Sequence, residues 1–521
     1  MSPQVADKLV IAVDFGQTNS SVSYTFIPEG CLPESLPNLS PRTVSNYLSG
    51  MMTCRGSSMH LEVPTLLRYP RDWVFQPLDE LKEEQPGAIH PDNHQIHWGL
   101  QVQQDMSRVM SHSGNNQTLL HGFKSLMSQS DNHQVQNERL IETLRRLSHK
   151  RSCPREISIH EMLLLVIIDY LTKLLGHAKD EIAGSNAIST TEMIICVPVF
   201  WKKKALRDMQ TCVSIAMKRV NFPGVKFSGG CMEKVFMIPE PEAAATRLLA
   251  GPSVIQEGDV FTILDVGGGT CNAVTYVVTQ GLPLRLSRQA VHHSGDSCGS
   301  NALNDAFRQL LRILLAGHEY LSRDGATLEG YICKLAVHDF ENFIKARWVV
   351  SEDNENKKLE IIGLKFDPGV PNQAEDPQLW QPNQLTIRSE HLNEIYAKKV
   401  ALTGGFGESI ALRRHLRETL ESFNAANNCN VGLYLFEAHN RITAIDAVSF
   451  GGVLRALDKS NGPTRVARSS YGVRCDEPYE HPKHGGQPTI PGFQDSSERY
   501  VEAIEWISKK SSLYFLYQWK N

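Results

Sequence analysis

The alternation of apolar and polar positions predicts two strand–turn–strand units, one in each half of the chain. In the first, an apolar run at 9–13 leads into the turn D-F-G-Q-T-N and the alternating segment S-S-V-S-Y-T-F. The second, F-T-I-L-D-V-G-G-G-T-C-N-A-V-T-Y-V-V, covers 261–278. In both, an Asp ends the apolar strand, and Gly and then Thr follow it. This layout indicates an internal duplication of an α/β unit and predicts two lobes.

Helical spacing and further strand patterns fill the chain around these units. Residues 157–183 have the broad apolar face of a core helix that ends before Gly184. The order continues with a buried strand at 193–200, a helix at 201–220, a strand, glycine turn and helix from 399 onward, and an amphipathic helix at 442–457. Strands that alternate with helices predict mixed sheets flanked by helices, with ligand chemistry in a crevice between two lobes.

Two segments lack such periodicity. Residues 28–59 are rich in Ser, Pro, Asn and Gly and are interpreted as an insertion before a short strand at 63–69. The chain after Leu457 is polar and punctuated by Pro and Gly, which predicts an irregular tail. We therefore expect a first lobe at 1–255, a second lobe at 256–445, and a closing helix with the tail at 446–521.

Composition and charge narrow the classes of function. The chain has 521 residues, 41% of them hydrophobic and 21% charged, which is typical of a folded protein with more than one core. The net charge of −4 gives no basic field for a nucleic-acid backbone, so nucleic acid is not an expected partner. The longest apolar run, at 162–168, is shorter than the ~20 residues of a membrane helix, so no membrane is expected. Eleven Cys without a C-x-x-C pair, and no secretory leader, indicate a cytoplasmic protein.

Glycine-rich turns at strand ends suit phosphate binding. Without a Cβ, glycine lets backbone N–H groups approach an anion closely. An Asp at the strand end can hold Mg²⁺ through its water shell, and a Thr hydroxyl can reach a phosphate oxygen. A single D-x-G-x-T is common in ordinary turns, but two of them followed by T-G-G-F-G at 403–407 favour a phosphate site. The alternative, three tight turns without a ligand, stays open at this point.

Six motifs in order resemble the nucleotide-binding domain of the seventy-kilodalton heat-shock (DnaK-type) chaperones, within the superfamily of actin and sugar-kinase ATPases. They are V-I-A-V-D-F-G-Q-T-N-S-S-V-S-Y, C-V-P-V-F-W-K-K-K-A-L-R-D-M, I-P-E-P-E-A-A-A-T-R-L-L, I-L-D-V-G-G-G-T-C-N-A-V-T-Y, V-A-L-T-G-G-F-G-E-S-I-A-L-R-R-H-L and I-D-A-V-S-F-G-G-V-L-R-A-L. The G-G-F-G variant, with H-H-S-G-D-S-C-G-S-N-A-L-N-D-A-F, is similar to the divergent branch that lacks the peptide-binding domain. The resemblance implies an α/β, actin-like ATPase fold with two ribonuclease-H-like lobes and a central nucleotide cleft.

The resemblance also implies roles for individual residues, with ATP or ADP and Mg²⁺ as cofactors. Asp14 and Asp265 would hold the metal through its waters, and Glu240 would orient those waters or the attacking water. Lys124 would stabilise the transferring phosphoryl group, and the catalytic set is Asp14, Lys124, Glu240, Asp265 and Thr270. The further nucleotide contacts expected are Gly16, Gln17, Thr18, Gly267, Gly268, Gly269, Thr270 and Asn272 at the phosphates, Lys345 at the ribose, and Gly404, Gly405 and Phe406 at the adenosine. For Lys345, the alternative is a surface position on a helix.

Three positions depart from the family pattern. Gln17 replaces a Thr next to the γ-phosphate, Asn272 replaces an Asp near the metal, and Glu408 replaces an Arg beside the adenine. Phosphoryl transfer depends on positioning and charge, and the loss of one contributor commonly slows it by about 10² to 10³. The sequence therefore predicts nucleotide binding with weak or impaired Mg-dependent ATP hydrolysis.

The leading functional hypothesis is an ATP-binding, chaperone-like protein that acts as a nucleotide-controlled switch, with a protein partner on its lobes or tail. The segment after Leu457 is much shorter than the family's peptide-binding domain, so none is expected. Two alternatives stay open. One is a fold repurposed as a small-molecule enzyme that binds its substrate in the interlobe cleft, with Asp296 or Asp305 as base, and the other is a nucleotide-binding scaffold without activity.

Other polar residues are interpreted as structural. The cluster of His292, His293 and Cys298 has no evident fourth ligand for zinc, and His481 and His484 belong to the tail. Cys271 is interpreted as a small buried hydrophobe, and the lysine run at 202–204 as a solvated helix face.

Overall fold

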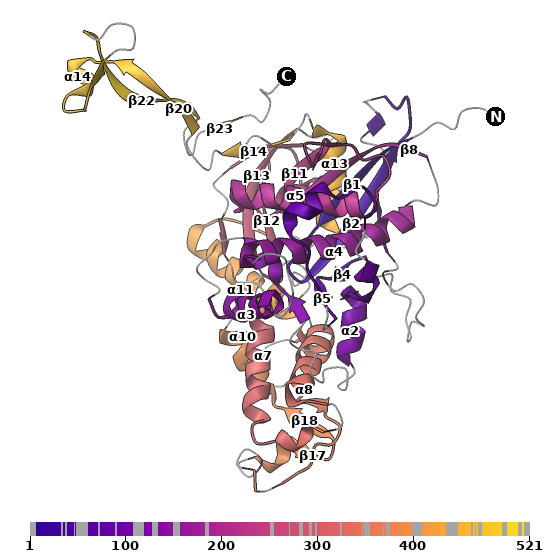
Figure 1. Cartoon of the computed structure of the whole chain (residues 1–521). Helices are drawn as coiled ribbons and strands as arrows, with labels where there is room; N and C mark the ends of the chain where they lie inside the picture. Colours follow the sequence, from indigo (N-terminus) through magenta and orange to yellow (C-terminus); the bar gives the residue numbers. More distant parts are fainter. Residues whose placement is uncertain are drawn as a thin grey trace. The chain divides into compact units, whose positions relative to one another are not determined.

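The computed structural model of the chain consists of two compact units (Figure 1). The first unit comprises Met1–Ser253, Leu264–Ala273 and Gly295–Asp458, and the second comprises Val254–Ile263, Val274–Ser294 and Lys459–Asn521. The structure describes residues 7–32, 35–36, 39–45, 47, 61–70, 73–88, 91–107, 119–127, 134–149, 157–182, 187–250, 255–269, 271–280, 285–290, 294–296, 300–323, 326–345, 347–348, 355–367, 369–370, 373, 376–398, 409–433, 446–459, 462–463, 465–466, 471–491, 497–508 and 513–514.

The N-terminal part of the first unit contains most of its strands. These are β1 (Asp7–Asp14), β2 (Asn19–Ile27), β3 (Arg42–Thr43), β4 (Val63–Pro64), β5 (Leu66–Arg68), β6 (His97–Trp98), β7 (Leu119–His121), β8 (Ile188–Val197), β9 (Phe227–Ser228), β10 (Cys231–Met232) and β11 (Val235–Pro239). The helices that pack with them are α1 (Leu78–Glu83), η2 (Pro91–Gln95), α2 (Gly99–Ser107), η5 (Phe123–Met127), α3 (Gln134–His149), α4 (Ile159–Ile182), α5 (Lys203–Arg219), α6 (Glu240–Leu249) and α13 (Ala447–Leu457).

The main sheet of this part has the strand order β11-β8-β1-β2-β3, with β4 paired to β2. Strand β1 is antiparallel to β2 and parallel to β8, which is in turn parallel to β11. The three parallel strands therefore end at one edge, where Asp14 lies opposite Cys196 and Val197 lies opposite Pro239. Glu240, the first residue of α6, follows Pro239 directly. The strand register thus brings Asp14 and Glu240 to the same edge of the sheet.

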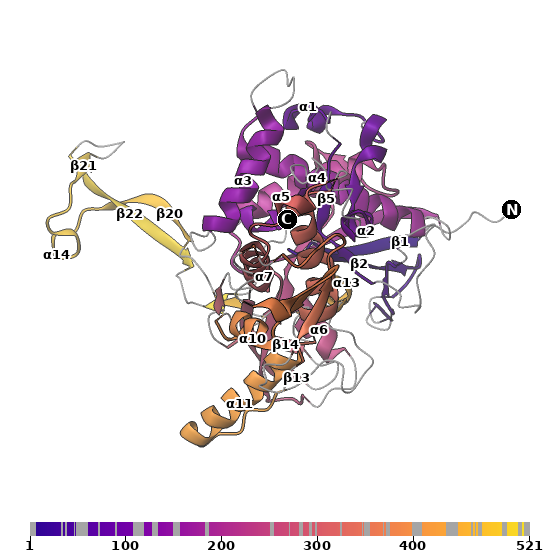
Figure 2. The ribbon, with the colours of Figure 1, turned by 90° about the horizontal axis from the view of Figure 1, so that it is seen from below.

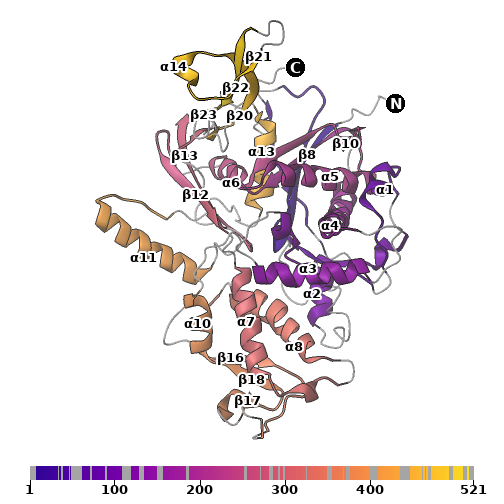
Figure 3. The ribbon, with the colours of Figure 1, turned by 60° about the vertical axis from the view of Figure 1, so that its left-hand side comes forward.

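Helices cover both faces of this sheet. Leu9, Ile11 and Val13 pack with α4 and α5 in one core, whereas Val10 and Ala12 pack with α6 and α13 in another. Figure 3 shows α4 and α5 on one side of β8, and α6 and α13 on the other. Because both faces of β1 are buried, its sequence is a continuous apolar run instead of an alternating one.

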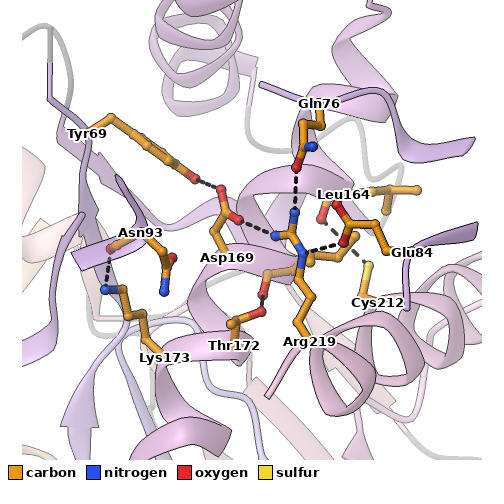
Figure 4. A network of polar contacts seen from close by, with 11 residues as sticks. Tyr69, Gln76, Glu84, Asn93, Leu164, Asp169, Thr172, Lys173, Cys212 and Arg219 are labelled. Carbon is orange, nitrogen blue, oxygen red and sulfur yellow. Dashed lines mark hydrogen bonds and ion pairs between the residues drawn. The ribbon is translucent and has the colours of Figure 1, made fainter. Parts of the chain in front are cut away.

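A buried charged network ties α4 to α5 (Figure 4). Arg219 of α5 donates a hydrogen bond to Asp169 of α4 over 3.0 Å, and the Tyr69 hydroxyl donates to the other oxygen of that carboxylate over 2.9 Å. Arg219 also donates to Gln76 and to Glu84, over 3.3 and 3.4 Å. Asp169 is 4% exposed and Arg219 is 6% exposed, so each depends on the other for compensation of its charge.

The first unit holds a further core, formed later in the chain (Figure 1). Its elements are α7 (Asn301–Leu314), η7 (Glu319–Leu321), α8 (Leu328–Lys334), the π-helix η8 (Leu335–Lys345), β16 (Lys357–Glu360), η9 (Pro377–Leu379), β17 (Trp380–Gln381), β18 (Gln384–Ile387), α10 (Ser389–Lys398) and α11 (Ile410–Asn427). The small sheet has the order β16-β18-β17, and both pairs are antiparallel. A small apolar cluster, which we name the Val102 patch, packs elements of both parts together and contains Leu66, Val102, Leu119, Cys333 and Val337.

The second strand–turn–strand unit consists of β12 (Val260–Val266) and β13 (Cys271–Gln280), which belong to a sheet with β14 (Arg285–Gln289) and β15 (Ser294–Asp296). The other strands late in the chain are β19 (Arg465–Val466), β20 (Tyr471–Pro478), β21 (Ile490–Pro491), β22 (Arg499–Ser508) and β23 (Leu513–Tyr514), with the short helix α14 (His481–His484). Figure 2 shows β20 and β22 as a long antiparallel pair, with β21 at its end.

These elements confirm an α/β fold, and they confirm the long helix predicted at 157–183 as α4. Other predictions need correction. The strand predicted at 63–69 is broken at Thr65 into β4 and β5, and the expected insertion at 28–59 contains the short strand β3. The tail contains β20 and β22, which its Pro and Gly content did not predict. Within the part of the chain that the structure describes, none of the helices has the length and apolarity that a bilayer crossing requires.

Candidate functional site

The first glycine turn joins β1 to β2 and is held in place by Thr65. The backbone N–H of Thr65 donates to the carbonyl of Thr18 over 2.7 Å, and the Thr65 hydroxyl donates to the carbonyl of Gly16 over 2.9 Å. Thr65 lies between β4 and β5, so the break in the predicted strand supplies the residue that fixes the turn. Asp14, at the end of β1, is half-buried at the start of this turn.

The second glycine turn, at 267–269, is held by the start of α7. The backbone N–H of Asn301 donates to the carbonyl of Gly268 over 2.9 Å, and that of Ser300 donates to the carbonyl of Gly267 over 3.4 Å. The first N–H groups of a helix have no partner within the helix, so the turn satisfies them. The geometry of the second turn therefore follows the position of α7.

The two turns are in direct contact. A Cβ added to Gly268 would lie 1.6 Å from the hydroxyl oxygen of Thr18, and one added to Gly269 would lie 2.8 Å from Cγ of Gln17. The Thr18 hydroxyl also donates to the side-chain oxygen of Asn301 over 3.4 Å. Only glycine permits this approach at 268 and 269. A phosphate group between Gly268 and Thr18 requires the turns to move apart.

Lys124 and Glu240 form a buried ion pair beside the first turn. Their Nζ and Oε1 atoms are 2.7 Å apart, and their side chains are 9% and 8% exposed. Lys124 belongs to η5, which follows β7, and its Nζ lies 5.8 Å from the centre of the Phe15 ring and 5.7 Å from that of Trp201. The rings of Phe15 and Phe123 also pack together, with centres 6.0 Å apart. Apolar contacts thus fix η5 next to the residue that follows Asp14.

Two carboxyl groups of the site, those of Asp14 and Asp265, have raised pKa values. Burial raises the pKa of Asp14 to about 7, with a further increase from the charge of Glu240 and an opposing effect of Lys124. Burial likewise raises the pKa of Asp265 to about 8, with Glu240 and Asp14 adding to it. For Lys124, burial opposes the charged form, but the surrounding carboxylates outweigh it and the pKa is raised. The cluster therefore carries more negative charge than Lys124 can compensate.

This excess of carboxylates fits a hydrated divalent cation. Mg²⁺ keeps several of its waters in proteins and needs few carboxylates, so Asp14 and Asp265 could hold it through water. In the described residues, no group of three or more His, Cys, Asp or Glu side chains is arranged to hold a metal ion directly. A cation held through its waters requires only carboxylates such as those of Asp14 and Asp265.

Asn272 lies inside the site, on β13. It is 1% exposed and makes a side-chain hydrogen bond to Asp265, which lowers the pKa of that carboxyl group. An Asp at this position would add a fourth acidic group to the cluster formed by Asp14, Glu240 and Asp265. The amide instead supplies a neutral partner for Asp265.

No model of a known protein family matches this sequence, and no curated protein matches it. The motifs and the geometry of the site are therefore the basis for assigning a function.

Lys345 is not on the surface, so the alternative of an exposed helix lysine is wrong. It is 3% exposed, and its Nζ lies 2.8 Å from both carboxylate oxygens of Glu341. Glu341 also accepts a hydrogen bond of 2.5 Å from Asn304 on α7. Asn304 is one helical turn from Asn301, whose side chain meets the first glycine turn. Lys345 and Thr18 are thus linked to positions one turn apart on α7, Lys345 through Glu341 and Thr18 directly.

Sequence reasoning missed the residues that hold the turns. Thr65 lies outside the motifs, and Asn301 and Asn304 were given no role although they lie in the segment H-H-S-G-D-S-C-G-S-N-A-L-N-D-A-F. The contacts of these three residues join positions 49, 283 and 37 residues apart. The available signals were the break of the 63–69 pattern at a Pro-Thr pair and the two Asn residues at the start of a helix. Neither signal indicates a partner so distant in the sequence.

Several expected residues lie outside the described part of the chain. These are Thr270, Gly404, Gly405, Phe406, Glu408, His292, His293 and Cys298, and of Asp296 the structure describes only the backbone.

Among the other residues singled out in the sequence, Asp305 forms an ion pair of 3.0 Å with Arg308. The lysines at 202–204 are exposed, as predicted, and His484 is buried beside Glu477 and Glu480. Cys271 is half-buried.

Proposed function

We propose that the chain binds ATP with Mg²⁺ between its two glycine turns and hydrolyses it slowly, as a nucleotide-controlled switch of the heat-shock chaperone class. The observation that carries this proposal is the contact between turns from two different hairpins, at Thr18 and Gly268, beside three carboxylates and one lysine. Glycine turns supply backbone donors for phosphate groups, and the acidic cluster supplies a place for a cation. A pair of tight turns with a purely structural role requires neither this close approach nor an acidic cluster.

The residues of the site have distinct parts in this proposal. The turns at 16–18 and 267–269 hold the β- and γ-phosphates, and Asp14 and Asp265 hold the waters of the metal. Lys124 balances the charge of the phosphoryl group in transfer, and Glu240 keeps Lys124 in place over 2.7 Å. The bound cation supplies charge stabilisation of the phosphates. In this arrangement an actin-like fold with two lobes places one turn on each lobe.

The proposal of slow turnover depends on Gln17 and Asn272. Phosphoryl transfer is accelerated mainly by positioned charge and hydrogen bonds, so Asn272 in place of a carboxylate, and Gln17 in place of a Thr hydroxyl, lower the rate more than they lower binding. Slow hydrolysis prolongs the ATP-bound state, which suits a switch: the nucleotide shifts the protein between two conformations by its different affinity for them. Closed and separated arrangements of the two turns are the conformations we propose.

Calorimetric titration with ATP and ADP, with and without Mg²⁺, tests binding, and single-turnover hydrolysis tests activity. We expect Mg-dependent binding of ATP, and a decrease in hydrolysis of about 10² to 10³ in Lys124→Ala, because a charged contributor to the transition state is removed. Lys204→Ala is the control, because this lysine side chain is 61% exposed. Absence of nucleotide binding by the unmodified chain would contradict the proposal and favour a metabolite enzyme. Tight binding without any turnover would favour a nucleotide-binding scaffold.

A further inference from the structure

The side chain of Gln17 connects three parts of the candidate site. Its Nε2 donates a hydrogen bond of 2.6 Å to the carbonyl of Gly122, and its Cγ meets Gly269 of the second turn. Gln17 itself belongs to the first turn. Gln17 thus links the first turn, the second turn and the segment that carries Lys124.

Gly122 lies between the end of β7 and the start of η5. Its φ is +70°, a conformation that favours glycine. The carbonyl of Gly122 also accepts hydrogen bonds from the backbone N–H of Ser125, over 3.2 Å, and from the Ser125 hydroxyl, over 2.9 Å. Together with Gln17, these contacts fix the start of η5, two residues before Lys124. The Gln17 amide is therefore one of the contacts that hold the segment before Lys124.

The other end of the amide is not satisfied. The Oε1 atom of Gln17 is buried and has no hydrogen-bond partner among the residues that the structure describes. A buried acceptor without a partner is unfavourable, so a donor is expected there when the site is in use. An ionised phosphate oxygen cannot donate a hydrogen bond, whereas water can. This chemistry favours a water molecule at Oε1.

We propose that Gln17 is a positioning residue that keeps Lys124 at a fixed position relative to both glycine turns and accepts a hydrogen bond from a water at the phosphates. Gln17 acts on turnover through the segment 122–124, and its amide fills the position between Gly122 and Gly269. The part of this proposal that concerns turnover rests on the proposed function. The part that concerns the position of η5 applies to the free protein and is tested separately.

The first test uses the free protein. Gln17→Met keeps the length of the side chain and its contact with Gly269 but removes the Nε2 donor and the Oε1 acceptor of the amide. We expect amide hydrogen exchange in the segment 119–127 to become about tenfold faster, the equivalent of one hydrogen bond. The matched control is Asn19→Leu, which removes another amide next to the same turn, one that donates over 2.7 Å to Glu62. Unchanged exchange at 119–127 in Gln17→Met would overturn the positioning role.

The second test measures turnover in a double-mutant cycle. We expect Gln17→Met to lower kcat about tenfold with a change of less than about threefold in the dissociation constant of ATP. In a Lys124→Ala background the same substitution should lower kcat by clearly less than tenfold, because the part of its effect that is transmitted through Lys124 is already lost. Additive effects of the two substitutions, or an equal loss in affinity and kcat, would overturn the proposal. If the unmodified chain binds no nucleotide, the proposed function fails, and the exchange result alone decides the role of Gln17.

Discussion

At the scale of single residues, the acidic cluster at the end of β1 contains more carboxyl groups than ammonium groups. Asp14, Asp265 and Glu240 face one ammonium group, that of Lys124. Because partial burial weakens the compensation of this excess by water, the pKa values of Asp14 and Asp265 are raised to about 7 and about 8. A bound cation would replace the protons of these carboxyl groups.

Replacement of Asp14 by Asn should stabilise the metal-free protein at pH 8. The folded-state pKa of Asp14, about 7, is above its ordinary value of 3.8, so the folded state holds a proton that the unfolded chain releases above pH 4. Stability contributed by this proton is present below pH 4 and is lost as the pH rises through 7. We expect Asp14→Asn to raise the free energy of unfolding at pH 8 by about 1 kcal/mol or more, since one pKa unit corresponds to about 1.4 kcal/mol.

Urea unfolding with a chelator, at pH 5 and pH 8, measures this difference. The gain from Asp14→Asn should shrink at pH 5, because the carboxyl group of the unmodified protein is then mostly protonated and neutral. Mg²⁺ should stabilise the unmodified protein at pH 8 more than the variant. An equal difference at both pH values would show that the carboxyl group does not titrate in this range.

At the scale of elements, close packing of α6 against α13 positions Glu240. A Cβ added to Gly451 of α13 would lie 1.9 Å from the carbonyl oxygen of Ala243 in α6, and the helices are also joined by a buried ion pair of 2.8 Å between Arg455 and Glu242. Glu240 is the first residue of α6. Movement of α6 therefore moves a carboxylate of the candidate site.

Gly451→Ala should destabilise the protein and weaken nucleotide binding. The added methyl group meets backbone atoms, which cannot rotate away, so we expect a loss of about 1 to 3 kcal/mol in the free energy of unfolding. Gly432→Ala is the control, because a Cβ there meets no atom within 4 Å. Thermal unfolding and ATP titration measure the two effects. A stable variant with unchanged ATP affinity would show that α6 and α13 can separate without moving Glu240.

The ion pair between α4 and α5 should contribute to stability without affecting the site. Arg219→Met leaves the carboxylate of Asp169 buried without its cation, which commonly costs about 3 to 5 kcal/mol. The control is Arg414→Met, since Arg414 forms an exposed i,i+4 pair with Glu418, and such pairs contribute about 0.3 to 0.5 kcal/mol. Chemical unfolding measures both. Equal effects of the two substitutions would indicate that water reaches Asp169.

At the scale of the whole molecule, only the first unit contains the described residues of the candidate site, and this unit has more than one core. The core around β1 and α4 and the core around α7 and α8 are joined by the Val102 patch, where α2 contacts α8 and η8. Lys124 belongs to the first of these parts and Lys345 to the second. The relative position of the two parts thus affects the spacing between Lys124 and Lys345, for which we propose phosphate and ribose contacts.

Val102→Asp should uncouple these two cores. Val102 is 0% exposed, and removal of a buried valine from an apolar contact costs about 1.5 to 3 kcal/mol. We expect faster amide hydrogen exchange in α8 and η8, with little change in α4, which has an extensive core of its own. Val74→Asp is the control, because Val74 is 41% exposed. Uniformly faster exchange over both cores would show that they unfold as one cooperative unit.

Much of the fold could be predicted from the sequence because the patterns are local. The run at 9–13 and the periodicity at 157–183 correspond to β1 and α4, and burial of both faces of β1 explains why its pattern does not alternate. The strands of the tail were harder to predict. Strand β20 has polar or charged residues at 474, 476 and 477 and ends at Pro478, and its side chains at 474–478 are exposed or half-buried, so its sequence resembles that of a loop.

The sequence by itself determined the two glycine turns, each at the end of an apolar strand, because glycine, Asp and strand patterns act over a few residues. Only the tertiary structure decided which atoms meet. Lys124 pairs with Glu240 over 116 positions, and Thr18 meets Asn301 over 283 positions. Such contacts depend on sheet order and on helix packing, which bring distant segments together. Local propensity therefore indicated the chemistry, and the packing of β1, β8, β11 and α7 determined where it is assembled.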